Sequence, residues 1–83
     1  MTFDGAIIKE QNVTFAIAVV QRHVLELSER DKALANFTRF FGITTVLMAQ
    51  DNRGTPQYFG RKDIVAFLAR TDPARIPWRR YTI

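Results

Sequence analysis

Residues 13–19 read Val-Thr-Phe-Ala-Ile-Ala-Val and alternate bulky with small side chains. Successive side chains of an extended chain point to opposite faces, so the bulky residues share one face. Thr14, Ala16 and Ala18 share the other. A strand that is small on one side favours a helix packed closely over that side. We expect this strand to run from Val13 to about Arg22.

The helix expected over the small side follows at residues 29–41. Ser28 is a favourable N-cap residue, and Asp31 three positions later makes a pattern like a capping box. Gly42 supplies a left-handed stop. The apolar stripe predicted to face the sheet consists of Leu34, Phe37 and Phe41, widened by Ala33 and Phe40.

The remaining elements are shorter, and turn signals separate them. Asp51-Asn-Arg-Gly54 is a strong turn sequence. Because Pro56 has no backbone N–H, the strand expected at 56–59 must either lie at an edge of the sheet or begin with this proline. We expect strands at 5–10, 43–50 and 56–59, a helix at 61–70 that buries Ile64, Phe67 and Leu68, and a last strand or a docked tail at 78–83.

The expected order of elements is therefore β-β-α-β-β-α-(β). This order predicts a small α+β fold, in which one sheet of four to five strands packs with two helices. With 83 residues and 47% hydrophobic residues, we expect residues 1–83 to form a single domain. Its segment 72–83 is basic and aromatic.

The composition argues against several kinds of chemistry. The chain has no cysteine, only one serine (Ser28) and only one histidine (His23), and its four glycines lie far apart. We therefore expect no catalytic residue, no metal site, no phosphate loop and no cofactor, which predicts a non-enzymatic protein. The longest apolar run, Phe15–Val20, is much shorter than the ~20 residues that span a bilayer. We expect a cytoplasmic protein with no membrane partner.

The net charge of +4 lies in the last part of the sequence. Residues 1–60 hold six basic and six acidic residues, whereas residues 61–83 hold six basic and two acidic ones. This asymmetry makes residues 61–83 the expected surface for a partner. The candidate interaction residues are Arg70, Arg75, Trp78, Arg79, Arg80 and Tyr81. In the alternative interpretation, Trp78 and Tyr81 anchor the tail on the core and only the arginines face water.

A second candidate site lies where the helix at 61–70 begins. Arg61 and Lys62 oppose the helix dipole at its positive end, and a bound anion would resolve that conflict. The candidate anion-binding residues are Tyr58, Gly60, Arg61 and Lys62. In the alternative, both cations are solvated or pair with Asp51 or Asp63.

Three functions follow from these features. The leading hypothesis is an interaction or accessory module that binds a protein partner or itself, as a homo-oligomer, through the tail and a sheet edge. The first alternative is a nucleic-acid-binding domain that uses the basic residues for phosphates and Trp78 and Tyr81 for base stacking. The second alternative is a binder of a small anionic ligand at Gly60–Lys62.

Overall fold

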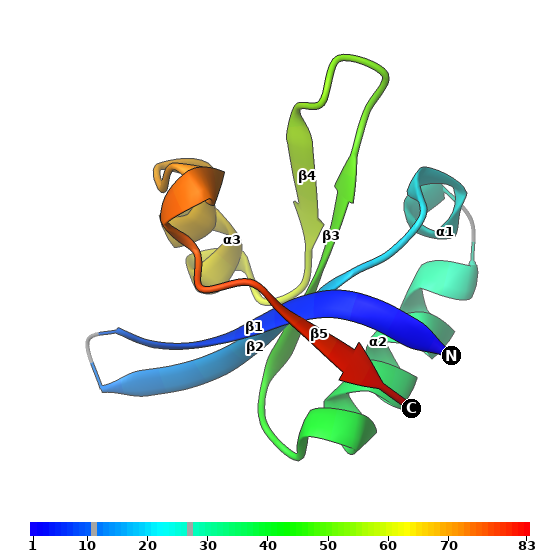
Figure 1. The fold of residues 1–83 in the computed structure, drawn as a ribbon, viewed down its shortest axis with the longest axis horizontal. Helices are drawn as coiled ribbons and strands as arrows, with labels where there is room; N and C mark the ends of the chain where they lie inside the picture. Colours follow the sequence, from blue (N-terminus) through cyan, green and yellow to red (C-terminus); the bar gives the residue numbers. More distant parts are fainter. Residues whose placement is uncertain (11, 27) are drawn as a thin grey trace.

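Five strands form one mixed sheet in a computed structural model that describes residues 1–10, 12–26 and 28–83 (Figure 1). The strands lie in the order β4-β3-β2-β1-β5. The elements are β1 (Thr2–Glu10), β2 (Val13–Val19), α1 (Arg22–Glu26), α2 (Glu29–Phe41), β3 (Thr45–Gln50), β4 (Pro56–Phe59), α3 (Lys62–Ala69), a 3-10 turn (Pro73–Arg75) and β5 (Arg79–Thr82). The predicted α+β class and the predicted order are confirmed.

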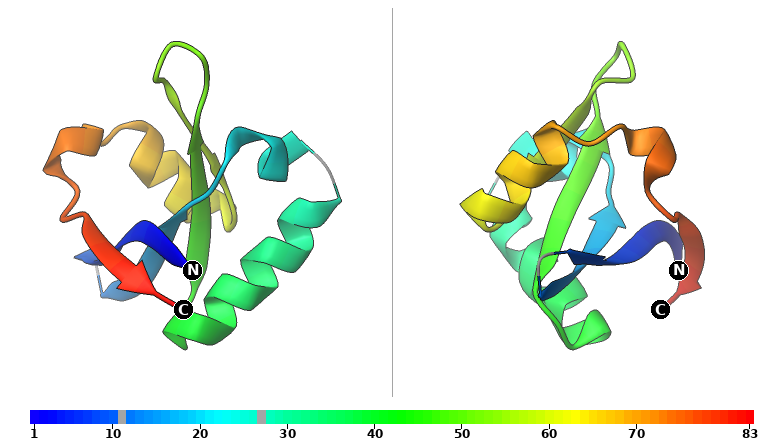
Figure 2. Two further views of the ribbon diagram at one scale, coloured as in Figure 1. Left: turned by 45° about the vertical axis from the view of Figure 1, so that its right-hand side comes forward. Right: turned by 90° about the vertical axis from the view of Figure 1, so that its left-hand side faces the viewer.

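β2 is the middle strand, and the two main helices lie on opposite faces of the sheet (Figure 2). β2 pairs antiparallel with β1 and parallel with β3. Its small side faces α2, where Ala18 shares a buried cluster with Phe37. The bulky side, with Phe15 and Ile17, faces α3. The predicted position of α2 over the small side is therefore confirmed, whereas the position of α3 over the bulky side was not predicted.

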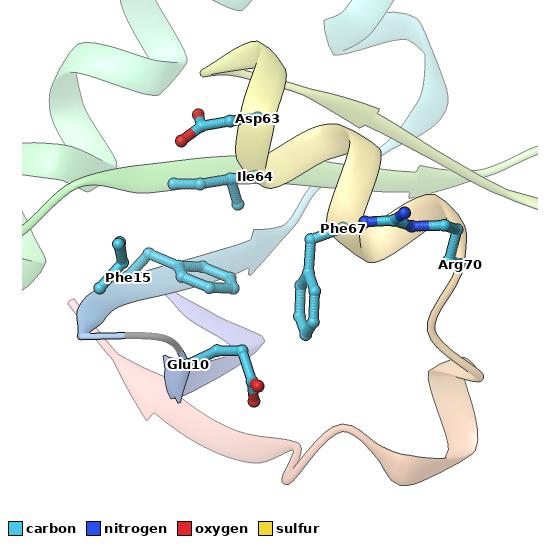
Figure 3. A pocket seen from close by; sticks show the side chains of 7 residues that line it. Glu10, Phe15, Asp63, Ile64, Phe67 and Arg70 are labelled. Atoms are coloured by element: carbon cyan, nitrogen blue, oxygen red, sulfur yellow. The ribbon is translucent and has the colours of Figure 1, made fainter.

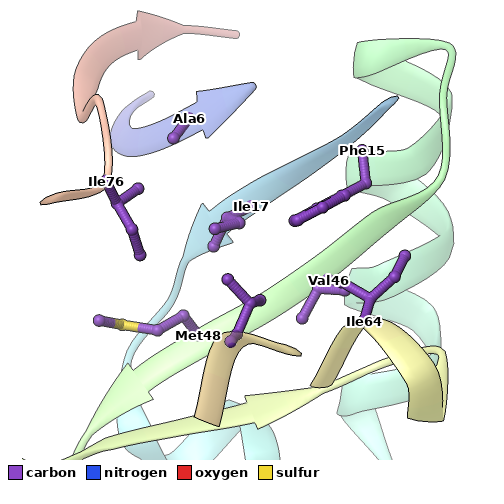
Figure 4. Close-up of a cluster of buried hydrophobic side chains, with 8 residues drawn as sticks. Ala6, Phe15, Ile17, Val46, Met48, Ile64 and Ile76 are labelled. Atoms are coloured by element: carbon purple, nitrogen blue, oxygen red, sulfur yellow. The ribbon is translucent and has the colours of Figure 1, made fainter. Parts of the chain in front are cut away.

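The face that carries α3 holds the larger part of the core (Figure 4). Each large apolar side chain that is fully buried contributes about 1.5–3 kcal/mol relative to exposure. Ile76, from the segment between α3 and β5, also packs here, so this segment is docked on the core. The buried members of this cluster are Ala6, Phe15, Ile17, Val46, Met48, Ile64, Leu68 and Ile76.

The face that carries α2 is held by aromatic rings. The ring of Phe3 on β1 meets that of Phe37 edge-on at 4.9 Å and stacks with that of Tyr81 at 5.5 Å. Tyr81 meets Phe41 edge-on at 5.2 Å. Each such pair adds about 0.5–1.5 kcal/mol beyond its area burial. We call Phe3, Phe37, Phe41 and Tyr81 the aromatic cluster; it ties β5 to both β1 and α2.

The expected strand from Val13 to about Arg22 is too long. β2 ends at Val19, and the N–H of Val20 still donates to the carbonyl of Met48 at 2.8 Å. The chain then turns into α1, which begins at Arg22 and was not predicted. Leu25 of α1 packs against the cluster on the α2 face, so its burial favours a short helix over a longer strand.

The two ends of α2 differ in how well they match the prediction. Gly42 has φ of 72°, and its N–H donates to the carbonyl of Thr38 at 2.8 Å, so the left-handed stop is confirmed. Ser28 stands at the N-cap position, but its side chain makes no capping hydrogen bond. Its φ of −57° and ψ of −14° are helical, whereas a capping serine has an extended backbone that directs its hydroxyl back to the helix.

Candidate functional site

β5 lies at one edge of the sheet and offers free backbone groups there. It pairs antiparallel with β1, with Phe3 opposite Tyr81, and the N–H of Ile83 donates to the carbonyl of Met1 at 2.8 Å. Backbone groups alternate between the two sides of an antiparallel strand, so residues 79, 81 and 83 bond toward β1. The N–H and C=O groups of Arg80 and Thr82 therefore point away from the sheet. We call these backbone groups the open edge.

The opposite edge, β4, begins with a proline. The N–H of Asp51 donates to the carbonyl of Thr55 at 3.0 Å, and the register sets Ala49 opposite Gln57. By the same alternation, Pro56 lies at an outward position, where it has no N–H to offer. Its place at the start of an edge strand is the one predicted from the sequence. Proline is a common way to prevent pairing at an edge. β5 is as short as β4 but contains no proline.

Exposed apolar side chains border β5 on the face that carries α2. Met1 is 76% exposed, Ile83 55% and Phe40 41%. We call these three residues the apolar patch. They line an open groove of about 570 Å³, and a second groove of about 400 Å³ shares Met1 and Phe37 with it. The apolar surface therefore runs from β5 along α2.

Phe40 corrects the sequence prediction, which placed it in the buried stripe of α2. Adjacent helical residues project about 100° apart, so Phe40 and Phe41 cannot both face the sheet. Phe41 takes the inner position, and Phe40 lies at the margin with its ring 5.6 Å from that of Phe3. No sequence signal singled out Met1 or Ile83.

Trp78 and Tyr81 have structural partners in the folded chain. The indole N–H of Trp78 donates to the carbonyl of Pro73 at 3.0 Å, and its half-buried ring packs on the core at the α3 face. Tyr81 belongs to the aromatic cluster. Residues 79–82 form a strand, so the tail is paired as well as docked. This geometry agrees with the interpretation in which both aromatic residues anchor the tail.

The basic candidates do not gather at one place. Arg80 pairs with Asp4 at 3.1 Å and, with Arg79, lines a cavity of about 370 Å³ next to Trp78. Arg70 and Arg75 are exposed and line two other cavities. The positive charge is therefore distributed along the tail instead of forming one concave basic surface.

Arg61, one of the predicted anion-binding residues, forms an ion pair with Asp63. The guanidinium of Arg61 donates to both carboxylate oxygens of Asp63, each at 2.7 Å. Lys62 is exposed, whereas Tyr58 packs on the core with its hydroxyl buried and without a hydrogen-bond partner. Burial raises the pKa of Tyr58. The four predicted residues thus lie in different environments, and the pairing of Arg61 is the one the alternative interpretation described.

This ion pair leads to a prediction about pH. The hydrogen bonds from Arg61 hold the pKa of Asp63 at about 2, below its ordinary 3.8. A lowered pKa means that the pair contributes stability above pH 3.8 and that this contribution is lost as the pH falls toward 2. In Arg61→Ala we expect the pKa of Asp63 to return toward 3.8, measured by carboxyl ¹³C NMR.

Lys62→Ala is the matched control, because it removes an equal charge one position away. The pKa of Asp63 should remain near 2 in that variant. An Asp63 titration that is unchanged by Arg61→Ala would contradict the pair. Phosphate added to the same sample tests the anion prediction, which requires saturable shifts of the Lys62 and Asp63 amide signals.

A small cavity lies between α3 and the ends of β1 and β2 (Figure 3). Its volume is about 160 Å³, and the rings of Phe15 and Phe67 meet edge-on beside it at 6.3 Å. Glu10, Asp63 and Arg70 bring charges of both signs to its walls. Ligand pockets usually measure about 300–1,000 Å³. This cavity therefore adds no candidate site.

Two other features concern the described part of the chain. Within residues 1–10, 12–26 and 28–83, no three His, Asp or Glu side chains gather closely enough to hold a metal ion. None of the helices described there is long and apolar enough to cross a membrane.

The chain matches no protein-family model, no curated protein and no solved structure. The most distinctive combination is the open edge of β5 with the apolar patch beside it.

Proposed function

We propose that the chain is a non-enzymatic interaction module that binds a protein through β5 and the apolar patch. The partner is either a different protein or a second copy of this chain. One observation carries the proposal: the β5 edge has no proline and is bordered by exposed apolar side chains, whereas the other edge carries Pro56. The C-terminal segment, as strand β5, is itself this edge of the sheet, so the tail and the sheet edge named in the leading hypothesis form one surface.

The chemistry of this surface suits an added β-strand. Arg80 and Thr82 present N–H donors and C=O acceptors, and each hydrogen bond formed there contributes about 0.5–1.5 kcal/mol. Apolar surface buried alongside adds about 25 cal/mol per Å². In this mode of recognition the backbone ladder gives affinity and the neighbouring side chains give specificity.

Nucleic-acid binding is supported less well by the same residues. Base stacking needs an exposed ring face, but Trp78 is half-buried and Tyr81 is enclosed by Phe3 and Phe41. Arg80 is already paired with Asp4. Binding of this kind would weaken steeply as salt rises, which distinguishes it from a largely apolar protein interface.

Amide hydrogen exchange at β5 tests the proposal. In the dilute chain we expect the outward N–H groups of Arg80 and Thr82 to exchange faster than that of Tyr81, which bonds toward β1. Binding should slow the exchange of both amides to the exchange rate of the Tyr81 amide. The measurement compares a dilute sample, a concentrated sample and a dilute sample in cell extract. Rapid exchange of both amides in all three would contradict the proposal.

A further inference from the structure

We infer that the partner is a second copy of this chain, joined by antiparallel pairing of β5 with β5 about a two-fold axis at Tyr81. The inference rests on the proposed function and adds the identity of the partner and the register. In this arrangement the two sheets join edge to edge into one continuous sheet.

The register follows from which backbone groups are free. The outward positions of β5 are Arg80 and Thr82, so an antiparallel partner strand must bond to both. A two-fold axis at Tyr81 sets Arg80 of each copy opposite Thr82 of the other. All the outward N–H and C=O groups of β5 then find partners in the second copy. The strand is thus complementary to itself.

Side-chain charge favours this register over one with the two-fold axis at Arg80. An axis at Arg80 would set the two Arg80 side chains directly opposite each other, and like charges at such positions are destabilising. With the axis at Tyr81, Arg80 faces a threonine and Arg79 faces Ile83 of the second copy. Arg80 also keeps Asp4 as its ion-pair partner.

The same axis covers the apolar patch. Tyr81, which lies on the α2 face, is at the axis, so both α2 helices lie on one face of the joined sheet. Phe40 and Ile83 border this seam in each copy. A stable dimer needs about 800 Å² from each partner, which is about one seventh of the 5663 Å² surface of the chain. A four-residue strand supplies too little of this area, so the inferred dimer requires the patch and its groove to lie in the interface.

Net charge gives the dimer a distinctive response to salt. Each chain carries +4, so two copies repel each other at long range and salt screens this repulsion. We therefore expect dimerisation to strengthen as the salt concentration rises. An acidic protein partner or a nucleic acid would show the opposite dependence.

Sedimentation equilibrium measures the association directly. Phe40→Ser should weaken the dimer at least about tenfold, because it removes apolar area from the seam. Thr82→Pro should weaken it similarly, because proline removes an outward donor while the ladder with β1 stays intact. Ile7→Ser is the matched control. Ile7 is 47% exposed and lies on β1 beyond the part that pairs with β5, so its loss should change the dimer constant less than about twofold.

Cysteine pairing tests the register, because the chain has no cysteine of its own. We would mix an Arg80→Cys variant with a Thr82→Cys variant, one of them tagged, and oxidise the mixture. Residues in a hydrogen-bonded antiparallel pair have Cα atoms about 5.5 Å apart, within disulfide reach. The mixed disulfide should clearly exceed the two homodimers taken together, which a random mixture would only equal. Homodimers in excess, or the three species in a statistical ratio, would overturn this register.

A chain that stays monomeric at about 500 µM would overturn the inference of self-association. The experiments distinguish failure of this inference from failure of the proposed function. If Arg80 and Thr82 amides are protected in cell extract while the pure chain is monomeric, the β5 surface binds another protein. If they are protected in neither condition, both proposals fail.

Discussion

Replacing Phe15 with alanine is expected to lower the free energy of unfolding by about 3–5 kcal/mol. Phe15 is 2% exposed, lies in the larger core and meets the ring of Phe67 edge-on at 6.3 Å. A chain of this size has a total stability of about 4–12 kcal/mol. The variant should therefore lose a large part of its stability. Urea unfolding followed by circular dichroism measures the change.

The matched control for this variant is Ile7→Ala, which also truncates an apolar residue of the first two strands. Ile7 is 47% exposed, so the expected change is within about 0.5 kcal/mol. A loss of less than about 1 kcal/mol for Phe15→Ala would contradict the tight packing between β2 and α3.

Gly5→Ala is expected to cost about 1–3 kcal/mol or more and to disturb β5. A Cβ at Gly5 would lie 2.7 Å from the carbonyl oxygen of Ile17, which is backbone and cannot turn aside. It would also lie 3.2 Å from the ring of Tyr81. Gly5 is paired with both Ala18 and Arg79, so β1 must shift against its two neighbours. Urea unfolding gives the stability, and amide exchange at Tyr81 gives the effect on β5.

Gly42→Ala separates this steric effect from backbone strain. Gly42 has φ of 72° and nothing within 4 Å of a Cβ built on it. Its replacement should cost about 1–2 kcal/mol through the left-handed backbone alone, and exchange at Tyr81 should not change. If Gly5→Ala kept both the stability and the exchange rates of the parent chain, the close approach of β1 and β2 would be wrong.

Local patterns predicted most of the elements. The alternation in residues 13–19 gave the correct faces because the residue period in a strand is two, whatever the rest of the fold does. Pro56 indicated an edge because proline lacks the N–H that an interior strand needs. The short helix α1 could not be foreseen, because it depends on the contact of Leu25 with a cluster built by distant residues. The missing cap at Ser28 follows from the helical φ and ψ of that residue, which the sequence does not reveal.

The candidate site was only partly predictable. The concentration of charge and aromatic residues in 72–83 pointed to the segment that includes the open edge. Pairing of β5 with β1 joins residues at opposite ends of the described sequence, and no local pattern encodes it. The apolar patch arises from the same pairing, because it gathers Met1 and Ile83 beside Phe40. The sequence predicted an anion site that includes Arg61 and Lys62. In the structure, Arg61 forms an ion pair with Asp63, which the sequence analysis gave as the alternative.

The pairing of residues 2–5 with residues 79–82 also sets an order of events during folding. Closing so long a loop is slow compared with forming the β1–β2 hairpin or either main helix. Until β5 arrives, the outer side of residues 2–5 of β1 stays unpaired, and the open edge and the apolar patch are not yet assembled. A chain that has not completed its fold therefore lacks the open edge and the apolar patch on which the proposed interface depends. Association through β5 would be restricted to chains that have finished folding.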